Sequence, residues 1–200
     1  TNKKLKSIYF LANIMINCKF KKKIMMEKAV FAGGCFWCTE AIFQRIHGVI
    51  SIKPGYTGGT IKNPCYREVC SGRTGHAEAV QIDYDHQLVS FESLLEIFFA
   101  THDPTTLNRQ GADIGTQYRS GIFYTSATQK MIAKKFIDQL NKSHFFKAPI
   151  VTEITPLDLF FDAEEDHHDY YNQNSEQKYC DYTITPKIEK IKKIFSDKLK

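Results

Sequence analysis

The sequence contains little cysteine, and the cysteines are too few to form a disulfide scaffold. Six occur among 200 residues, whereas small secreted domains held together by disulfides are much richer in this residue. The chain also lacks an apolar run of about 18 residues, the length that an ordinary membrane-spanning helix needs. It has no internal repeat and no Pro- or Ser-rich linker. These absences favour a single globular domain whose cysteines are available for redox or metal chemistry.

Basic residues are scarce outside the N-terminal segment. The formal net charge is +5, but residues 1–28 hold eight lysines and a single acid. The remainder contains 19 basic and 21 acidic residues, a net charge of −2. A nucleic-acid-binding face needs clustered Lys and Arg on the folded domain. The sequence therefore predicts no nucleic-acid partner.

Residues 1–27 are predicted to be an N-terminal extension, and residues 28–200 the folded domain. A basic start precedes the short apolar run 8–16, which resembles a signal peptide, although residues 17–19 form a poor cleavage site. The segment is then either an export signal or a disordered extension, or sequence upstream of a start at Met25 or Met26. We expect a cytoplasmic protein, with export or membrane anchoring through this segment as the alternative.

Apolar patterns predict strands and helices that roughly alternate along the domain. Two long polar loops, 57–75 and 101–117, interrupt this order, and loops of such length are usually functional. The pattern favours a single α+β or α/β domain, a sheet with helices packed on it. The expected strands are 28–32, 48–56 (broken at Pro54-Gly55), 76–85, 118–125 and 150–155. The expected helices include residues 40–46, start at caps near Ser90 and Ser126 and start again near 185, with Met131 on the apolar face of the helix after 126. Residues 162–174 are expected to be a short acidic helix or loop.

The stretch 32–40 carries the first chemical signal. Two glycines separate its strand from its helix, so Cys35 falls at or just inside a helix N-terminus. Free backbone N–H groups and the helix dipole at that position favour a thiolate, which makes Cys35 a candidate nucleophile. Together with Cys38 it also fits a redox pair, or half of a zinc site completed by Cys65 and Cys70. Otherwise we expect the last two cysteines to be small buried residues.

Glu78 interrupts an apolar strand, between Ala77 and Ala79. A carboxyl group facing a dry site there would have a raised pKa and could act as a general acid. An exposed glutamate on an edge strand is the alternative. Trp37, beside Cys35, is expected to form a pocket wall. The acidic and histidine-rich run 164–169 lacks metal-binding His spacing, so we expect a solvated face there.

Several motifs together resemble the A-type peptide methionine sulfoxide reductases, in unbroken order over residues 28–190. The resemblance implies reduction of the S-epimer of methionine sulfoxide, free or in oxidised proteins, with no metal and no organic cofactor. It also implies a two-layer α+β sandwich of ferredoxin-like type. The motifs are GCFWCTE (34–40), GYTGG (55–59), NPCYREVCSG (63–72), TGHAE (74–78), HDPT (102–105), NRQG (108–111) and DIGTQYRS (113–120).

The resemblance also assigns roles to residues. It makes Cys35 the nucleophile that attacks the sulfoxide sulfur and becomes a sulfenic acid. The expected partners are Glu78 as the acid that protonates the sulfoxide oxygen, Tyr66 and Tyr118 as the hydroxyls that bind it, Phe36 and Trp37 as the wall for the methyl group, and Asp113 as a lining residue. Such a site suits a group that is polar at oxygen and apolar at methyl.

Two features leave the assignment open in detail. The resolving cysteine could be Cys180, the preferred candidate, or Cys38, and thioredoxin would recycle the resulting disulfide in a monomeric enzyme. Cys65 stands where threonine is more usual in the family. A general thiol–disulfide oxidoreductase and a zinc-binding module remain the competing hypotheses.

Overall fold

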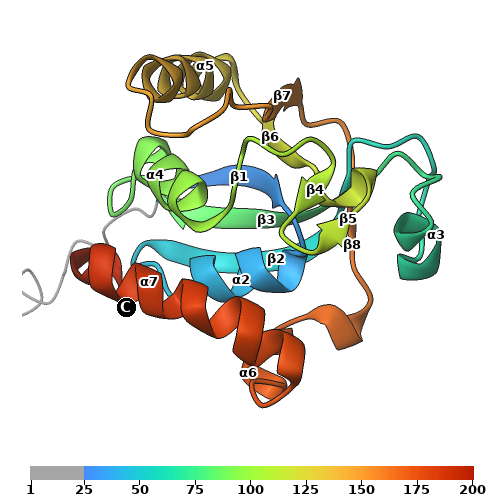
Figure 1. Cartoon of the computed structure of the whole chain (residues 1–200). Helices are drawn as coiled ribbons and strands as arrows, with labels where there is room; N and C mark the ends of the chain where they lie inside the picture. Colours follow the sequence, from blue (N-terminus) through green and yellow to red (C-terminus); the bar gives the residue numbers. More distant parts are fainter. Residues whose placement is uncertain (1–24) are drawn as a thin grey trace, which may run out of the picture.

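A computed structural model describes residues 25–200, so the predicted extension 1–27 lies almost entirely outside the described residues (Figure 1). None of the helices in the described part is both long and apolar enough to span a bilayer. The elements are β1 (Met26–Gly33), α2 (Phe36–Phe43), β2 (Val49–Thr57), α3 (Tyr66–Cys70), β3 (Ala77–Asp85), α4 (Phe91–Thr101), β4 (Arg109–Gln110), β5 (Asp113–Ile114), β6 (Ser120–Tyr124), α5 (Ala127–Lys142), β7 (Glu153–Pro156), β8 (Phe160–Asp162), α6 (Tyr170–Gln173) and α7 (Thr185–Ile194).

Six strands form one mixed sheet in the order β7-β6-β1-β3-β2-β8. All neighbouring pairs are antiparallel except β6 and β7, which are parallel. The short strands β4 and β5 pair separately as a hairpin. Because β1 and β3 are antiparallel neighbours, the residues that follow β1 lie beside those that begin β3, at the same end of these two central strands (Figure 1).

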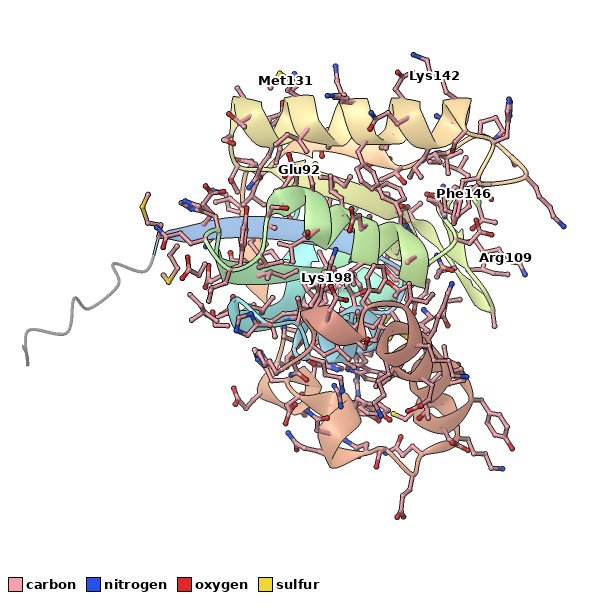
Figure 2. The ribbon with its side chains drawn as sticks, turned by 90° about the vertical axis from the view of Figure 1, so that its left-hand side faces the viewer. Glu92, Arg109, Met131, Lys142, Phe146 and Lys198 are labelled. Atoms are coloured by element: carbon pink, nitrogen blue, oxygen red, sulfur yellow. The ribbon has the colours of Figure 1, made fainter. Side chains whose placement is uncertain are left out.

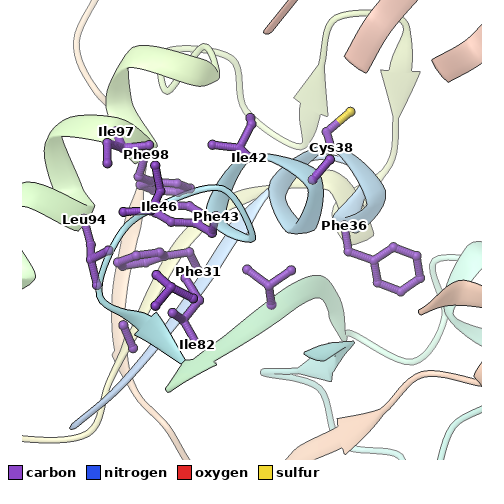
Figure 3. Close-up of a cluster of buried hydrophobic side chains, with 14 of the residues drawn as sticks. Phe31, Phe36, Cys38, Ile42, Phe43, Ile46, Ile82, Leu94, Ile97 and Phe98 are labelled. Atoms are coloured by element: carbon purple, nitrogen blue, oxygen red, sulfur yellow. The ribbon is translucent and has the colours of Figure 1, made fainter. Parts of the chain in front are cut away.

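The main core lies between this sheet and helices α2, α4 and α7. Alternate residues of β1 point to opposite faces, as the two-residue period of a strand requires: Phe31 belongs to the main core and Val30 to a smaller cluster on the other face. The Phe31 ring stacks on Phe98 of α4 with centroids 4.9 Å apart. Figure 3 shows this cluster beside helix α2, whose first turn carries Phe36 and Cys38 in different directions.

Helix starts follow the capping expected from the sequence. The hydroxyl of Ser90 accepts a hydrogen bond from the backbone of Ser93 at the start of α4, and Ser126 caps α5 in the same way through Gln129. Met131 does not lie on the apolar face of α5, contrary to the expectation from its spacing. Its side chain is 65% exposed and lies on the outer side of the helix (Figure 2).

The predicted strand break at Pro54-Gly55 is wrong. Strand β2 continues to Thr57 and keeps its register with β3 through this pair. Strand β8 packs closely against Gly55, where a Cβ would collide with the backbone oxygen of Phe161. Glycine at this position therefore lets β2 continue beside β8. The two polar loops also contain short elements, helix α3 in the first and the β4–β5 hairpin in the second.

Replacing Gly55 with alanine should therefore destabilise the protein by about 1–3 kcal/mol, because β8 must move away to make room. Denaturant unfolding would measure the change. Lys53→Ala, two residues away on the same strand, removes only an exposed ion pair with Asp162 and should cost less than about 1 kcal/mol. Equal losses in the two variants would contradict the close packing of β8 on β2.

Candidate active site

The seven residues expected to hold the substrate and act on it line one small pocket of about 160 Å³. The start of α2, helix α3, strand β3, strand β5 and a 3₁₀ turn each contribute to it. An eighth side chain, Tyr179 from the C-terminal segment, completes the wall. The lining residues are Cys35, Phe36, Trp37, Tyr66, Glu78, Asp113, Tyr118 and Tyr179. Residues from most of the domain are thus gathered around one thiol.

Cys35 occupies the N-cap position of α2 and is 8% exposed. Gly34, before it, has a φ of 90°, a conformation that residues with a side chain rarely adopt. A Cβ at this position would also collide with the side chain of Gln110. The expected stabilisation of a Cys35 thiolate is not found. Burial, a hydrogen bond with Cys38 and the charge of Glu78 raise the pKa of Cys35 well above its ordinary value.

The carboxyl group of Glu78, rather than a Cys35 thiolate, accepts a hydrogen bond from a free N–H at the N-terminus of α2. The backbone N–H of Phe36, in the first turn of α2, donates to Glu78 Oε2 at 3.0 Å. Glu78 is only 2% exposed, and its burial raises the pKa of its carboxyl to about 8, with smaller contributions from the charges of Asp113 and Cys38. Most Glu78 side chains therefore carry a proton at neutral pH.

Cys35 and Cys38 interact, so the ionisation of each thiol affects the pKa of the other. The hydrogen bond from Cys35 lowers the pKa of Cys38 to about 7, and the positive charge of Lys187 and the hydroxyl of Tyr179 act in the same direction. The Tyr179 hydroxyl lies 3.8 Å from Cys38 Sγ. Two interacting thiols lose their protons as a pair, and the hydrogen bond between them lowers the pKa of Cys38 and raises that of Cys35.

Tyr66 and Tyr118 bring two hydroxyl groups to the pocket. Burial raises the pKa of both, so both remain protonated hydrogen-bond donors at neutral pH. The backbone of Tyr66 is held by Glu164, whose Oε1 accepts its N–H at 2.7 Å. The other oxygen of Glu164 accepts from the hydroxyl of Tyr56 on β2 at 2.8 Å. A carboxylate from the C-terminal half thus ties α3 to the sheet.

The apolar side of the pocket is a continuous aromatic wall. Phe36 and Trp37 have centroids 6.2 Å apart, and Trp37 stacks on Tyr170 of α6 at 3.7 Å with an interplanar angle of 6°. Tyr179 meets the edge of Trp37. This wall fixes the orientation of Trp37 and leaves one side of the pocket suited to a methyl or thioether group.

Sequence reasoning missed three contributors, Glu164, His167 and Tyr179. The expected solvated face at residues 164–169 is wrong for His167, which is 6% exposed and lies 4.4 Å from the Tyr66 ring. The available signal for Tyr179 is its place beside Cys180, in a C-terminal tail that could fold back over the site. Long-range pairing of Glu164 leaves no local signal.

Among residues 25–200, the cysteines at 65, 70 and 180 do not line this pocket. Cys180 is completely buried in the core, Cys65 is exposed, and Cys70 is partly buried, so the expectation of two buried cysteines on the first loop is wrong for Cys65. It caps α3, where its backbone N–H donates to Glu68. Within residues 25–200, no three His, Cys, Asp or Glu side chains gather as a metal site would need. The four-cysteine zinc site therefore does not form.

Comparison with known proteins decides the family. The family model described as "Peptide methionine sulfoxide reductase" matches residues 27–199. The chain belongs to this family. It is 51% identical to the peptide methionine sulfoxide reductase MsrA of Saccharolobus solfataricus, over 88% of this chain and 98% of that protein. It is 52% identical to MsrA of Deinococcus radiodurans, over 87% of this chain and 84% of that protein.

Solved structures agree with this membership. Mxr1 from Saccharomyces cerevisiae in reduced form matches with a TM-score of 0.71 and 34% identity, covering 78% of this chain and 89% of that one. A structure of Mxr1 in complex with Trx2 matches with a TM-score of 0.51 and 26% identity, covering 72% and 84% of the two chains. The family predicted from the motifs is confirmed, as is a single domain with a mixed sheet and packed helices. The protein is thus a methionine sulfoxide reductase.

The raised pKa of Glu78 predicts a pH-dependent cost of folding. A folded-state pKa of about 8 against about 4.3 in the unfolded chain means that unfolding releases a proton between these values. Stability from this group is present at low pH and is lost as pH rises toward 8. Glu78→Gln cannot ionise, so its stability relative to wild type should increase by on the order of 3 kcal/mol between about pH 5 and about pH 8.

Denaturant unfolding at the two pH values measures that difference. Glu165→Gln, an exposed glutamate, is the matched control and should track wild type at both. A constant difference between Glu78→Gln and wild type across this range would mean that Glu78 ionises normally in the fold.

Proposed function

We propose that Cys35 is the nucleophile that reduces methionine sulfoxide in this pocket. Its sulfur attacks the sulfoxide sulfur, and the sulfur–oxygen bond of the substrate breaks. The transient bond between Cys35 Sγ and the substrate sulfur then breaks, the oxygen passes to Cys35 as a sulfenic acid, and methionine leaves with the electron pair of that bond, so atoms and electrons balance between thiol and sulfoxide. The supporting observation is that the thiol and a proton-holding carboxyl share one small pocket.

Glu78 acts as the acid of this step in our proposal. Protonation of the sulfoxide oxygen weakens its bond to sulfur and makes attack by Cys35 easier. A carboxyl group with a pKa of about 8 holds its proton at neutral pH and releases it more easily than a tyrosine does. The position of Glu78 is fixed by the N–H of Phe36, so its second oxygen is free to face the substrate.

The rest of the pocket divides the substrate into polar and apolar parts. Tyr66 and Tyr118 donate hydrogen bonds to the sulfoxide oxygen, and Asp113 lines the same side. Phe36 and Trp37 receive the methyl group. This division is supported by the protonated state of both hydroxyls and by the stacked aromatic wall.

Cys38 is the first partner to resolve the sulfenic acid in our proposal, ahead of Cys180. The Cys38 thiolate attacks Cys35 Sγ, a disulfide forms, and the sulfenic oxygen leaves as water. Hydrogen bonding between the two thiols and the lowered pKa of Cys38 support this order. Cys180 is fully buried, and burial and the charge of Cys38 raise its pKa, so its thiol is less suited to attack the sulfenic acid first. It could take over the disulfide from Cys38 in a second exchange.

A thioredoxin then reduces the enzyme disulfide. The relative Mxr1 was solved in complex with Trx2, which supports the same class of reductant here. The substrates would be oxidised proteins and free methionine sulfoxide. A pocket of about 160 Å³ has room for the sulfoxide end of one side chain, which both kinds of substrate present.

Finer features of the architecture belong to the same proposal. The central strands follow the order β6-β1-β3-β2 with antiparallel pairing, and α2 and α4 connect them, which supports a ferredoxin-like two-layer core. Residues 28–200 would form the catalytic domain, and residues 1–27 an extension. The enzyme would work as a monomer, because all eight pocket residues come from one chain.

Cys35→Ser should abolish reduction of methionine S-sulfoxide, because serine is a far weaker nucleophile than cysteine at neutral pH. Release of methionine under single-turnover conditions measures the step directly. Cys65→Ser, at an exposed cysteine outside the pocket, is the matched control and should keep full activity. Retained activity in Cys35→Ser would overturn the assignment, and insulin reduction requiring both Cys35 and Cys38 would indicate a general oxidoreductase.

Glu78→Gln should lower the rate of methionine release by about 10²–10⁴-fold, the usual contribution of a positioned general acid. The wild-type rate divided by the variant rate should fall as pH rises through about 8, where Glu78 loses its proton. This ratio removes the ionisation of Cys35, whose raised pKa affects both rates. Single-turnover rates from about pH 6 to about pH 10 would show it, and a ratio that stays constant through this range would contradict the role of Glu78.

Peptide mapping after one turnover without reductant identifies the resolving cysteine. We expect the disulfide between Cys35 and Cys38 to form first, with a disulfide to Cys180 appearing later. In Cys180→Ser the first disulfide should form at the wild-type rate. An initial Cys35–Cys180 disulfide, or persistent sulfenic acid in that variant, would show that Cys38 does not resolve it.

A further inference from the structure

A second pocket is also lined by the reactive thiol. It has a volume of about 100 Å³, and its lining includes Cys35, Cys38, Gln110, Asp113, Tyr179 and Lys187. Cys35, Asp113 and Tyr179 also line the first pocket. Glu78, Tyr66 and Tyr118 line the first alone, and Cys38 and Lys187 the second alone. The thiol pair therefore has two separate approaches.

A hydrogen bond joins two of the residues that line both pockets. The hydroxyl of Tyr179 donates to Asp113 Oδ2 at 2.9 Å and lies 3.8 Å from Cys38 Sγ. Tyr179 comes from the C-terminal segment and Asp113 from strand β5, so two distant parts of the chain meet at this contact. The polar and acidic groups proposed to act on the sulfoxide line the first pocket, and Cys38 lines the second.

The charges of the second pocket suit an anion. Lys187 of α7 brings a positive charge close enough to Cys38 to favour its thiolate. Its neighbours along the lining, Gln110, Gly111, Ala112 and Thr183, are uncharged. Asp113 is the single acidic lining residue, and it already accepts the hydroxyl of Tyr179. An incoming thiolate would meet Lys187 as the nearest cation of the lining.

We propose that the second pocket is the entry site for the reductant's thiolate, which attacks Cys38 there while the sulfoxide uses the first pocket. The space holds one small side chain, such as a cysteine on an exposed loop of a protein reductant. This inference rests on the proposed function, because it takes the Cys35–Cys38 disulfide as the form that is reduced. It adds a site and a role for Lys187.

The exchange balances as follows. The reductant thiolate attacks Cys38 Sγ, a bond between the reductant sulfur and Cys38 forms, and the Cys35–Cys38 bond breaks. The electron pair of that bond goes to Cys35, which takes up a proton from solvent. A second thiol of the reductant then attacks the reductant's own sulfur in the mixed disulfide and releases Cys38. The enzyme gains two electrons, and the reductant leaves as a disulfide.

Thiol–disulfide exchange determines which sulfur leaves when Cys38 is attacked. The incoming sulfur, the attacked sulfur and the leaving sulfur lie close to one line. A thiolate entering the second pocket meets Cys38 with Cys35 as its leaving group, and Cys35 then lies at the first pocket, ready for another sulfoxide. Separate approaches allow the reductant to act without crossing the aromatic wall and hydroxyls of the first pocket.

Small thiols of different charge test the role of Lys187. The oxidised full-length enzyme is reduced by 2-mercaptoethanesulfonate (anionic), 2-mercaptoethanol (neutral) or cysteamine (cationic), compared at equal thiolate concentration and low salt. We expect wild type to react about 3–10-fold faster with the anionic than with the cationic thiol, a range typical of one nearby partly screened charge. Lys187→Gln should remove this preference and Lys187→Glu should reverse it.

Lys193→Glu is the matched control, because Lys193 lies on the same helix, is exposed and does not line the pocket. It should keep the wild-type preference. Each variant should also give the wild-type burst of methionine without reductant, since that step uses the first pocket. An unchanged charge preference in Lys187→Glu would overturn the inference and leave the proposed function intact. A missing burst in wild type would instead overturn the proposed function.

Discussion

A single hydrogen bond, from the backbone N–H of Phe36 to Glu78 Oε2, connects the first turn of α2 to strand β3. It brings the nucleophile and the carboxyl group into one pocket, because Cys35 directly precedes Phe36. It also satisfies one oxygen of a carboxyl group that is 2% exposed, which burial would otherwise leave without a partner. The rest of the site is arranged around this contact: hydroxyls on one side, aromatic rings on another, and Cys38 behind the thiol.

Much of this arrangement could be predicted from local sequence. The Gly-Gly turn placed Cys35 at the start of a helix, Ser90 and Ser126 marked two helix starts, and Glu78 between alanines indicated a buried carboxyl. These predictions succeeded because short-range backbone and burial patterns determine them. The family motifs supplied the partners of Cys35, which lie far apart in the chain and which local patterns could not have brought together.

The failures come from tertiary contacts that leave no local pattern. The thiolate expected at Cys35 depended on a free helix N-terminus, but Glu78 occupies it and burial raises the pKa of Cys35. The break expected at Gly55 did not account for β8, which packs on that residue. Glu164 and Tyr179 reach the site through contacts with residues about 100 and 66 positions away.

Infrared difference spectroscopy of the reduced enzyme, with Glu78→Gln as the reference, tests most directly whether Glu78 holds a proton at neutral pH. The spectrum should contain a protonated carboxylic acid band that is present at about pH 6 and disappears with a midpoint near the pKa of about 8. The band should be absent from the variant at every pH. A Glu78 signal that is already carboxylate at pH 6, with a midpoint near the ordinary value of about 4.3, would contradict this account of the site.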